Sequence, residues 1–477
     1  MTFGELHYYA DQMISALRDG GCTERDRVIL ALPDSFEFIS AIVGVQRLGA
    51  VAVPVSPSLS SSEYQSVVDQ TGASILICAP SLAEQISPAG CSLLIIEFQH
   101  GPWSLLWQMR ADRAAARKRE FLVPPDLALL LYTSGSTNRA KCVMHSHRSI
   151  AAACENVGSD LMGLNAEDRV LCIPRPSFSY GLGFGVFFPL FAGAVTIVTY
   201  GQPNIPTTVD VLRRLRPTVL CSVPSFLAVL LHSGGLNRDD FSCVRFITSA
   251  GEPLSIRLYE TFRSRFGVEV LDGIGATETL THFISNRPGE SLPGSCGTAI
   301  RGCEVSLLDQ SGNSIPNGAI GTLHVKSPTV FLGYWQEAKL TAAVLSGKRL
   351  LLRDNLYVDS KGHYIYCGRQ DDMLKVSGMW ISTGDVQDAI CSLSGVLEAF
   401  VTTREDERAR RRLVAYVVPK AGIEITSAEI LLGIRSILPI DSLPSAIVMV
   451  PKIARTPNGK VSRSELPDPG WPTSQNH

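Results

Sequence analysis

The chain has 477 residues, of which 45% are hydrophobic and 18% are charged, and its formal net charge is −2. This balance gives no reason to expect nucleic acid or an acidic membrane as a partner, and it excludes a largely disordered chain. A chain of this length is expected to form two or three packed units.

The first two-thirds of the chain alternate between helical and strand-like patterns. Residues 3–21 carry apolar side chains at helical spacing and end at two glycines, which predicts a helix. Short apolar runs at 26–33 and 73–80 predict strands, and residues 36–57 predict a helix that leads into another strand. This alternation predicts parallel sheets covered by helices on both faces, which bind ligands at the carboxyl ends of their strands.

Residues 176–200 carry no charge and are long enough to span a bilayer. Glycines and a proline interrupt the stretch, so we predict a buried helix followed by a buried strand rather than a membrane span. The 12 cysteines are scattered without a C-x-x-C pair, which suits a reducing compartment, and the N-terminus lacks the apolar core of a secretory signal. We therefore expect a cytoplasmic protein that has neither a membrane nor a nucleic acid as partner.

The pattern changes after about residue 290. Residues 303–328 alternate apolar and polar side chains around turn residues, which predicts hairpins of a small β subdomain near 290–370. The last hundred residues predict a compact α+β unit. We predict an α/β fold in which a large N-terminal domain, residues 1–370, precedes a small C-terminal domain, residues 371–477, with a hinge at residues 370–372.

Residues 129–147, "LLLYTSGSTNRAKCVMHSH", resemble a phosphate-binding loop. Gly135 and Lys141 have the spacing of a Walker A motif, but Ala140 replaces its second glycine and Cys142 replaces its magnesium-binding hydroxyl residue. The residues themselves are therefore consistent with a damaged P-loop, with another kind of phosphate loop, or with a polar turn.

Seven motifs occur together in one order, and in that order they resemble the adenylate-forming superfamily, most closely its benzoate and other aryl-CoA ligases. The motifs are "YTSGSTNRAKCVMHSH", "FSYGLGFGVFFPL", "VPSFLAVLL", "VRFITSAGEPL", "DGIGATETLTHFISNRPG", "YIYCGRQDDMLKVSGMWIS" and "RTPNGKVSRSEL". The resemblance identifies the first motif as a loop that holds the β- and γ-phosphates of ATP by hydroxyls, backbone N–H groups and a lysine. The loop departs from the family's T-G-x-P-K-G at Asn138, Ala140 and Cys142, and the added Cys142 side chain predicts slower loop closure.

The resemblance implies that a carboxylic acid attacks the α-phosphate of ATP and forms an acyl-adenylate and pyrophosphate. It assigns Thr277 to the α-phosphate, Glu278 to Mg²⁺, and Lys460 to a mobile ammonium that bridges the acid and the α-phosphate. The residues that it assigns to ATP or AMP are Thr133, Ser134, Gly135, Ser136, Thr137, Lys141, Gly251, Glu252, Pro253, Asp272, Gly273, Ile274, Asp354, Tyr366 and Arg369.

The resemblance also implies a second step in which a thiol attacks the adenylate and releases AMP. For this step the family rotates its C-terminal domain about an aspartate that matches Asp371. The rotation withdraws Lys460 and presents a tunnel segment with Gly378 and Lys375, where a glycine lets a narrow pantetheine arm pass.

The acyl pocket implied by the resemblance is apolar and aromatic. Relatives that activate amino acids place an aspartate before the pocket helix, whereas this chain has Phe178, Ser179 and Tyr180 there. A buried α-ammonium would lack a partner, so we expect a benzoate-like acid. The predicted pocket residues are Phe178, Tyr180, Val223, Leu227, Ala250, Gly275, Ala276, Leu280 and His282.

The acceptor thiol is predicted to be CoA, and the alternative is the phosphopantetheine of an aryl carrier protein in natural-product synthesis. The basic motif that usually precedes the family's last strand is replaced by "DSLPSAI", so both acceptors stay open. A remote alternative is a non-catalytic nucleotide-binding relative, against which Lys460, Glu278, Asp354 and Arg369 together argue. We expect a monomer or homodimer. The segment "TFGEL" resembles a family segment that some forty or more residues usually precede, so either those strands are dispensable here or the true N-terminus is longer.

Overall fold

The computed structural model describes residues 1–86, 88–98, 105–110, 123–133, 141–201, 203–309, 311–370, 374–376, 379–381, 383–406, 411–455 and 461–470. Its contacts divide the chain into two compact units. The first comprises Met1–Cys221, Gly275–His282 and Ser327–Lys348, and the second comprises Ser222–Ile274, Phe283–Lys326 and Arg349–His477.

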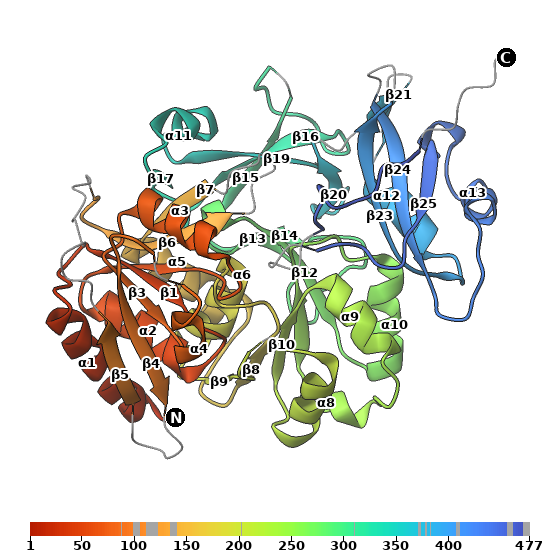
Figure 1. Ribbon diagram of the computed structural model, residues 1–477. Coiled ribbons are helices and arrows are strands. Elements are labelled where there is room, and N and C mark those ends of the chain that lie inside the picture. Colours follow the sequence, from red (N-terminus) through yellow and green to blue (C-terminus); the bar gives the residue numbers. More distant parts are fainter. Residues whose placement is uncertain are drawn as a thin grey trace. The chain divides into compact units, whose positions relative to one another are not determined.

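An eight-stranded sheet in the first unit has the strand order β17-β7-β6-β2-β1-β3-β4-β5 (Figure 1). The five central strands from β6 to β4 are parallel, and the pairs at both edges are antiparallel. Every residue of β1 and β3 is buried, as expected for strands covered on both faces. The strands are β1 (Arg27–Ala31), β2 (Val51–Pro54), β3 (Ile75–Cys78), β4 (Ser92–Phe98), β5 (Leu105–Arg110), β6 (Leu127–Thr133), β7 (Lys141–Ser146) and β17 (Gly333–Tyr334).

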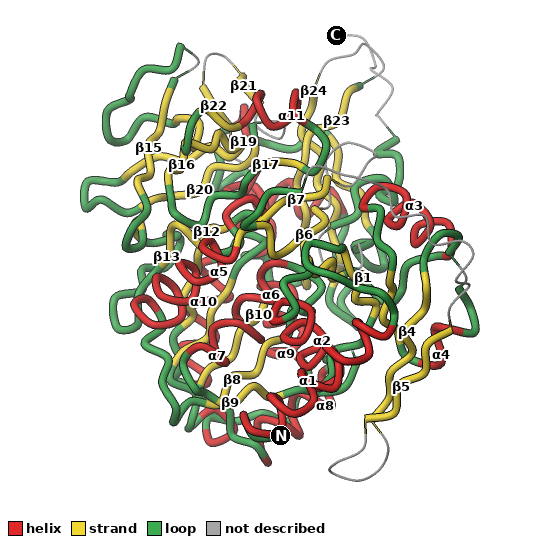
Figure 2. The backbone as a smooth tube through the Cα atoms, turned by 90° about the vertical axis from the view of Figure 1, so that its left-hand side faces the viewer, coloured by secondary structure: helices red, strands yellow, loops and turns green. Residues whose placement is uncertain are grey.

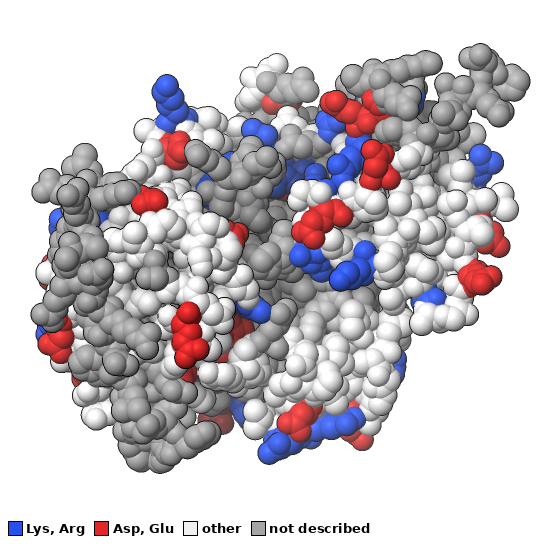
Figure 3. Space-filling model, viewed as in Figure 1, with Lys and Arg blue, Asp and Glu red and all other residues white. Residues whose placement is uncertain are grey.

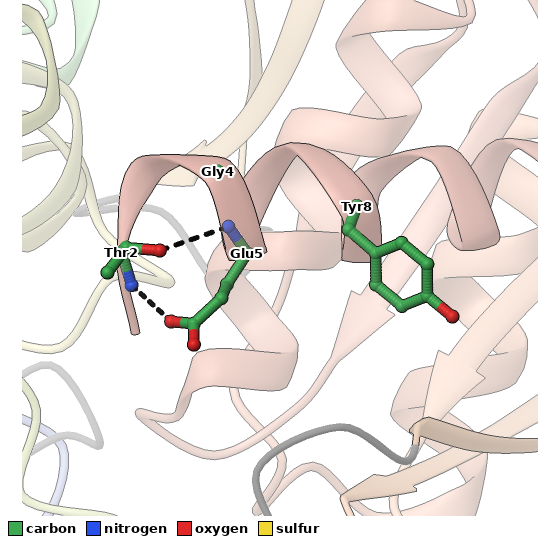
Figure 4. Close-up of a pocket in the computed structure, with 4 residues that line it drawn as sticks. All are labelled: Thr2, Gly4, Glu5 and Tyr8. Atoms are coloured by element: carbon green, nitrogen blue, oxygen red, sulfur yellow. Dashed lines mark hydrogen bonds between the residues drawn. The ribbon is translucent and has the colours of Figure 1, made fainter.

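The first three helices of this unit begin at side-chain caps, whereas the fourth, α4, has none. The Thr2 hydroxyl accepts a hydrogen bond from the Glu5 N–H at 3.2 Å, and the Glu5 carboxylate accepts one from the Thr2 N–H (Figure 4). Thr2, Gly4, Glu5 and Tyr8 line a surface hollow at this end of the helix. The helices are α1 (Phe3–Asp19), α2 (Phe36–Arg47), α3 (Ser61–Thr71) and α4 (Pro80–Ala83).

The remaining part of the first unit contains a short parallel group in which β8 pairs with both β9 and β10. Residues 176–200 form consecutive short helices with a buried interior, as predicted, but the strand after them is only partly buried. Of its three residues, Ile197 is buried whereas Val195 is 51% exposed, because β9 is the edge strand next to β8. No helix in the described residues is long and apolar enough to cross a membrane. The elements are α5 (His147–Ala153), the π-helix η1 (Cys154–Leu161), β8 (Arg169–Cys172), α6 (Ser179–Leu182), the π-helix η2 (Gly183–Phe187), α7 (Phe188–Phe191), β9 (Val195–Ile197), α8 (Ile205–Arg214), β10 (Val219–Ser222), the 3₁₀-helix η4 (Thr277–Thr279), α11 (Ala338–Val344) and β18 (Leu345–Ser346).

The second unit begins with parallel strands and continues with antiparallel ones. Strands β11 and β12 are parallel, whereas β15, β16, β19 and β20 pair in antiparallel fashion, as the hairpin pattern predicted. The elements are α9 (Pro224–His232), η3 (Asp239–Phe241), β11 (Phe246–Ser249), α10 (Ile256–Phe266), β12 (Val270–Gly275), β13 (His282–Ser285), β14 (Thr298–Ala299), β15 (Glu304–Leu308), β16 (Gly321–Lys326), β19 (Arg349–Val358) and β20 (Tyr364–Arg369).

The last hundred residues form the predicted α+β arrangement with a hydrophobic core of its own. Strands β23 and β24 are antiparallel, and β25 joins β24 in parallel. Val386 and Ile390 of one helix and Ile430 of another pack against this sheet. The elements are β21 (Leu374–Val376), β22 (Met379–Ile381), α12 (Thr383–Cys391), β23 (Val396–Glu405), β24 (Arg411–Pro419), α13 (Ser427–Ile434), η5 (Ile440–Ser442) and β25 (Ala446–Met449).

The face drawn in Figure 3 carries charges of both signs. Its acidic and basic side chains are interspersed among uncharged ones. The predicted α/β fold class is confirmed by these sheets and by the structural neighbours described below.

Candidate active site

The predicted phosphate loop connects two antiparallel strands. Thr133 is the last residue of β6 and Lys141 is the first residue of β7, and the strand register places them opposite each other. The loop between them, with Ser134, Gly135, Ser136 and Thr137, lies outside the described residues. Strands β6 and β7 therefore form a hairpin that holds the two ends of the loop opposite each other.

Cys142 is part of strand β7 rather than of the loop. In the register of β6 and β7 it lies opposite Tyr132. Its side chain is 2% exposed and packs in the hydrophobic core of the sheet. Burial raises the pKa of its thiol to about 12, so it is uncharged. The Cys142 side chain thus packs in the core of the sheet, and its effect on loop closure stays a prediction.

Residues 275–282 form a tight turn that carries Thr277 and Glu278, which are both half-buried. The hydroxyl of the buried Thr279 accepts a hydrogen bond from the Ala276 N–H at 3.1 Å and lies 2.8 Å from the Thr281 carbonyl oxygen. Leu280 takes a left-handed φ of 60°, which is uncommon for a leucine. The turn thus holds two predicted site residues in a defined, partly strained backbone.

His145 positions this turn, although sequence reasoning gave it no role. Its Nε2 lies 2.7 Å from the Thr277 carbonyl oxygen, and its side chain is fully buried. Burial lowers the pKa of the imidazole to about 4, so the ring is neutral at pH 7 and Nε2–H donates to that carbonyl. The histidine lies within the first motif, but the sequence does not show which distant backbone group it meets.

Tyr334 is a second residue that sequence reasoning missed. Its hydroxyl donates to Oε1 of Glu278 at 2.7 Å, and Nζ of Lys141 lies 5.3 Å from the centroid of its ring. The backbone N–H of Phe331 donates to the Glu278 carbonyl oxygen at 2.8 Å. Two predicted site residues, 137 positions apart in the sequence, thus contact one tyrosine.

The predicted acyl-pocket residues Tyr180 and His282 lie in an aromatic cluster together with Phe184, which was not predicted. The ring of His282 lies 5.6 Å from that of Tyr180 and 4.8 Å from that of Phe184, measured between centroids. Burial lowers the pKa of His282 to about 3, so the imidazole is neutral. No described residue hydrogen-bonds either of its buried ring nitrogens.

The backbone of Gly275 lies directly against this cluster. A Cβ added at Gly275 would come within 2.7 Å of the Thr281 carbonyl oxygen and 3.1 Å of Cδ2 of His282. Among the other predicted pocket residues of this unit, Phe178 and Ala276 are half-buried, whereas Leu280 is fully buried.

In the second unit, Glu252 has two polar partners. Its Oε2 accepts from the Ser225 N–H in the first turn of α9 at 3.1 Å, and its Oε1 pairs with the Arg455 guanidinium. Arg455 also pairs with Glu398.

The other predicted site residues of this part of the chain differ in burial. Gly251 and Pro253 are exposed and Val223 is half-buried, while Leu227 and Ala250 are buried.

Asp272, one of the residues predicted to bind ATP or AMP, is a buried carboxyl group. Burial raises its pKa to about 8, so it is largely protonated at pH 7. The Cys296 thiol donates to Oδ2 at 3.8 Å, and no described residue hydrogen-bonds Oδ1. Its neighbours Gly273 and Ile274 are buried and half-buried, respectively.

Asp354, Tyr366 and Arg369, which are predicted to bind ATP or AMP, lie together on strands β19 and β20. Asp354 lies opposite Arg369 in the strand register, and the Tyr366 hydroxyl donates to Oδ1 of Asp354 at 3.3 Å. Leu352 and Arg353 precede Asp354 within the same strand. A carboxylate, a phenol and a guanidinium side by side suit the hydroxyl groups of a sugar.

The residues predicted for domain rotation and thiol access are mostly outside the described part. Asp371, Gly378 and Lys460 lie outside the described residues. Lys375 lies in β21 opposite Trp380, and its side chain is not described. Their roles stay predictions.

Comparison with known proteins gives the family. Residues 1–335 match the model of the AMP-binding enzyme family, and residues 385–460 match the model of the AMP-binding enzyme C-terminal domain. The chain is 30% identical to a benzoate–CoA ligase of Thauera aromatica, with 98% of this chain and 90% of the relative aligned. It is 34% identical to an anthranilate–CoA ligase of Pseudomonas aeruginosa, with 96% and 88% aligned.

A solved structure agrees with these relatives. The crystal structure of the anthranilate CoA ligase AuaEII in complex with anthranoyl-AMP superposes with a TM-score of 0.86 at 27% identity, covering 98% of this chain and 91% of that one. The family predicted from the seven motifs is thereby confirmed. The chain belongs to the AMP-binding enzyme family, the superfamily of adenylate-forming ligases.

Proposed function

We propose that this enzyme activates a benzoate-like carboxylic acid as its acyl-adenylate and transfers the acyl group to the thiol of CoA. In the first step, an oxygen of the carboxylate bonds to the α-phosphorus of ATP, the bond to the β-phosphate breaks, and pyrophosphate leaves. In the second step, the thiol sulfur bonds to the carbonyl carbon, the bond to AMP breaks, and AMP leaves. The names of the aryl-CoA ligase relatives support this chemistry.

The observation that carries the proposal is the turn at residues 275–282. Near its middle, Glu278 meets Tyr334, whose ring faces the ammonium of Lys141. At its ends, Gly275 and His282 lie against the aromatic cluster. One short segment thus contacts two sets of residues. The charged side chains of Glu278 and Lys141 suit phosphates and their metal ion, and the aromatic cluster around His282 suits a flat ring.

The chemistry must bring two anions together, so the residues supply charge rather than a strong base. Lys141 offers a cation, and the half-buried Thr277 offers a hydroxyl donor to a phosphate oxygen. The Glu278 carboxylate is a hard oxygen ligand of the kind that Mg²⁺ prefers when it is shared with phosphates, so we propose Glu278 for the metal. The bound ion would reduce the repulsion between the phosphates and the acid.

Pyrophosphate exchange into ATP tests the first step. We would measure exchange with benzoates, aminobenzoates, cinnamates and fatty acids, and we expect activity with benzoate-like acids and little with fatty acids. A protein that exchanges pyrophosphate with none of these acids would instead fit a non-catalytic nucleotide-binding relative.

His282 makes a sharper prediction about the ring of the acid. One ring nitrogen of its neutral imidazole is a hydrogen-bond donor and the other is an acceptor. No described residue makes a hydrogen bond to either nitrogen. A hydroxyl or amino group on the substrate ring would satisfy one of them, and an unmade buried hydrogen bond costs about 1–3 kcal/mol. We expect His282→Phe to lower kcat/KM for hydroxy- and aminobenzoates about 10-fold relative to benzoate. An equal change for all three acids would contradict this role.

The acceptor is tested separately from the acid. Wild-type enzyme loaded with the best acid would be offered CoA or a phosphopantetheine-bearing aryl carrier protein at matched concentrations. We expect thioester formation with CoA to be faster. A much faster rate with the carrier protein would favour the carrier-protein ligase alternative.

A further inference from the structure

Residues 331–335 hold two distant parts of the first unit together, and we call them the 331–335 segment. The Leu332 N–H donates to the Met144 carbonyl oxygen and the Trp335 N–H to the Cys142 carbonyl oxygen, both at 2.8 Å, so the segment continues the sheet beyond β7 (Figure 2). On its other side, the Phe331 N–H donates to the Glu278 carbonyl oxygen. The segment therefore connects the strand that begins at Lys141 with the turn that carries Glu278.

The segment is itself firmly held. The Thr341 hydroxyl accepts from the Tyr334 N–H at 2.9 Å, and the Trp335 indole N–H donates to the Gln70 carbonyl oxygen at 3.0 Å. Phe331, Tyr334 and Trp335 are each less than 5% exposed, and the rings of Phe331 and Tyr334 pack edge to face at 4.9 Å. A buried side chain with this many restraints can define the position of the groups that it touches.

Tyr334 touches one anion and one cation with different parts of its side chain. Its hydroxyl donates to the Glu278 carboxylate at 2.7 Å, which restrains the carboxylate without neutralising it. Its ring lies 5.3 Å from the Lys141 ammonium, within the range of a cation–π contact. Because an aromatic face attracts an ammonium without forming an ion pair, this contact leaves Lys141 able to pair with a phosphate.

We propose that Tyr334 is a positioning residue of the adenylation step, which sets the Glu278 carboxylate and the Lys141 ammonium before the nucleotide binds. The proposal rests on the proposed function, because it assumes that Glu278 and Lys141 serve the phosphates of ATP. The hydroxyl orients the carboxylate for the metal, and the ring aligns the ammonium for the phosphate. The two parts of the side chain are therefore expected to affect different kinetic constants.

Two substitutions separate these parts. Tyr334→Phe keeps the ring and removes the hydroxyl, whereas Tyr334→Leu removes both. Tyr64→Phe is a matched control, because Tyr64 is a fully buried tyrosine of the same unit whose hydroxyl donates to the Ser56 carbonyl oxygen at 3.0 Å. Pyrophosphate exchange would be measured across concentrations of ATP and of Mg²⁺, together with the thermal midpoint of each variant.

For Tyr334→Phe we expect kcat of exchange to fall about 10-fold and the Mg²⁺ concentration for half-maximal rate to rise several-fold, with a small change in KM for ATP. For Tyr334→Leu we expect a further rise of about 2- to 5-fold in KM for ATP, as the loss of a cation–π contact implies. Tyr64→Phe is expected to change the thermal midpoint without changing the Mg²⁺ requirement.

The outcomes distinguish this inference from the proposed function. Suppose that the wild type exchanges pyrophosphate, and that Tyr334→Phe and Tyr64→Phe have the same kcat and the same Mg²⁺ requirement. Tyr334 then has only a structural role, and the inference is overturned. If the wild type itself shows no exchange, the proposed function fails instead. Should Tyr334→Leu not fold, the comparison of the two tyrosine-to-phenylalanine variants still decides the question.

Discussion

At the scale of single residues, burial sets the charge state of the groups around the candidate site. His145 is fully buried and neutral, and its Nε2–H holds the Thr277 carbonyl oxygen at 2.7 Å. Asp272 shows the opposite case, because burial raises the pKa of that carboxyl group to about 8 and keeps it protonated. Both groups are uncharged at pH 7 because the protein interior lacks the hydration that stabilises a charged group in water.

His145 predicts a pH dependence of stability. Its pKa is about 4 in the folded protein and about 6.5 in an unfolded chain, so the unfolded state binds the proton first as the pH falls. The stability that comes from the neutral imidazole is present above pH 6.5 and is lost as the pH falls from about 6.5 to about 4. Glutamine keeps an N–H donor but does not titrate.

We therefore expect the free energy of unfolding of the wild type to fall relative to that of His145→Gln by about 1–3 kcal/mol between pH 7 and pH 4. Urea unfolding of both proteins at several pH values measures it. The other titrating groups, His282 and Asp272 among them, are common to both proteins and cancel in the difference. A difference that does not change with pH would rule out this account of His145.

At the scale of elements, the turn at residues 275–282 depends on a glycine at its start. The space beside the Gly275 Cα is filled by the Thr281 carbonyl group and the His282 ring. A Cβ cannot fit there unless the backbone of the turn moves, and the turn carries Thr277 and Glu278. A methyl group at this position would therefore disturb both the phosphate side and the ring side of the candidate site.

We expect Gly275→Ala to destabilise the fold by about 1–3 kcal/mol and to lower pyrophosphate exchange more than that loss explains. Gly4→Ala is the matched control. Gly4 lies in the first turn of α1, where an added Cβ would meet a single ordinary contact at 3.9 Å (Figure 4), so alanine should raise the thermal midpoint slightly. Thermal melts and exchange rates of both variants check the prediction, which an active Gly275→Ala enzyme of unchanged stability would refute.

At the scale of the whole molecule, the proposed function consists of two chemical steps that follow one another. Lys460, which lies outside the described residues, is the residue that the family resemblance assigns to the first step alone. The C-terminal α+β part has its own hydrophobic core, in which Val386, Ile390 and Ile430 pack on the β23–β24–β25 sheet. An independent core is what a segment needs in order to rotate without unfolding.

We expect Lys460→Ala to slow adenylate formation by about 10²- to 10³-fold and to leave acyl transfer from a preformed acyl-adenylate largely intact. The two rates would be measured by pyrophosphate exchange and by CoA consumption with synthetic acyl-adenylate. Lys452→Ala removes an exposed lysine of the same region and should affect neither rate. Equal losses in both steps would argue against a role confined to the first.

The sequence by itself determined the family, the α/β class and the hairpins after residue 303, because each of these depends on local order: seven motifs in a row, or alternation within a short segment. It did not show that Cys142 is a buried strand residue or that β9 has an exposed edge, since strand pairing decides both. Only the tertiary structure placed His145 on Thr277, and Tyr334 between Lys141 and Glu278. Those contacts join residues that lie far apart in the chain, and packing, rather than any pattern along the sequence, brings them together.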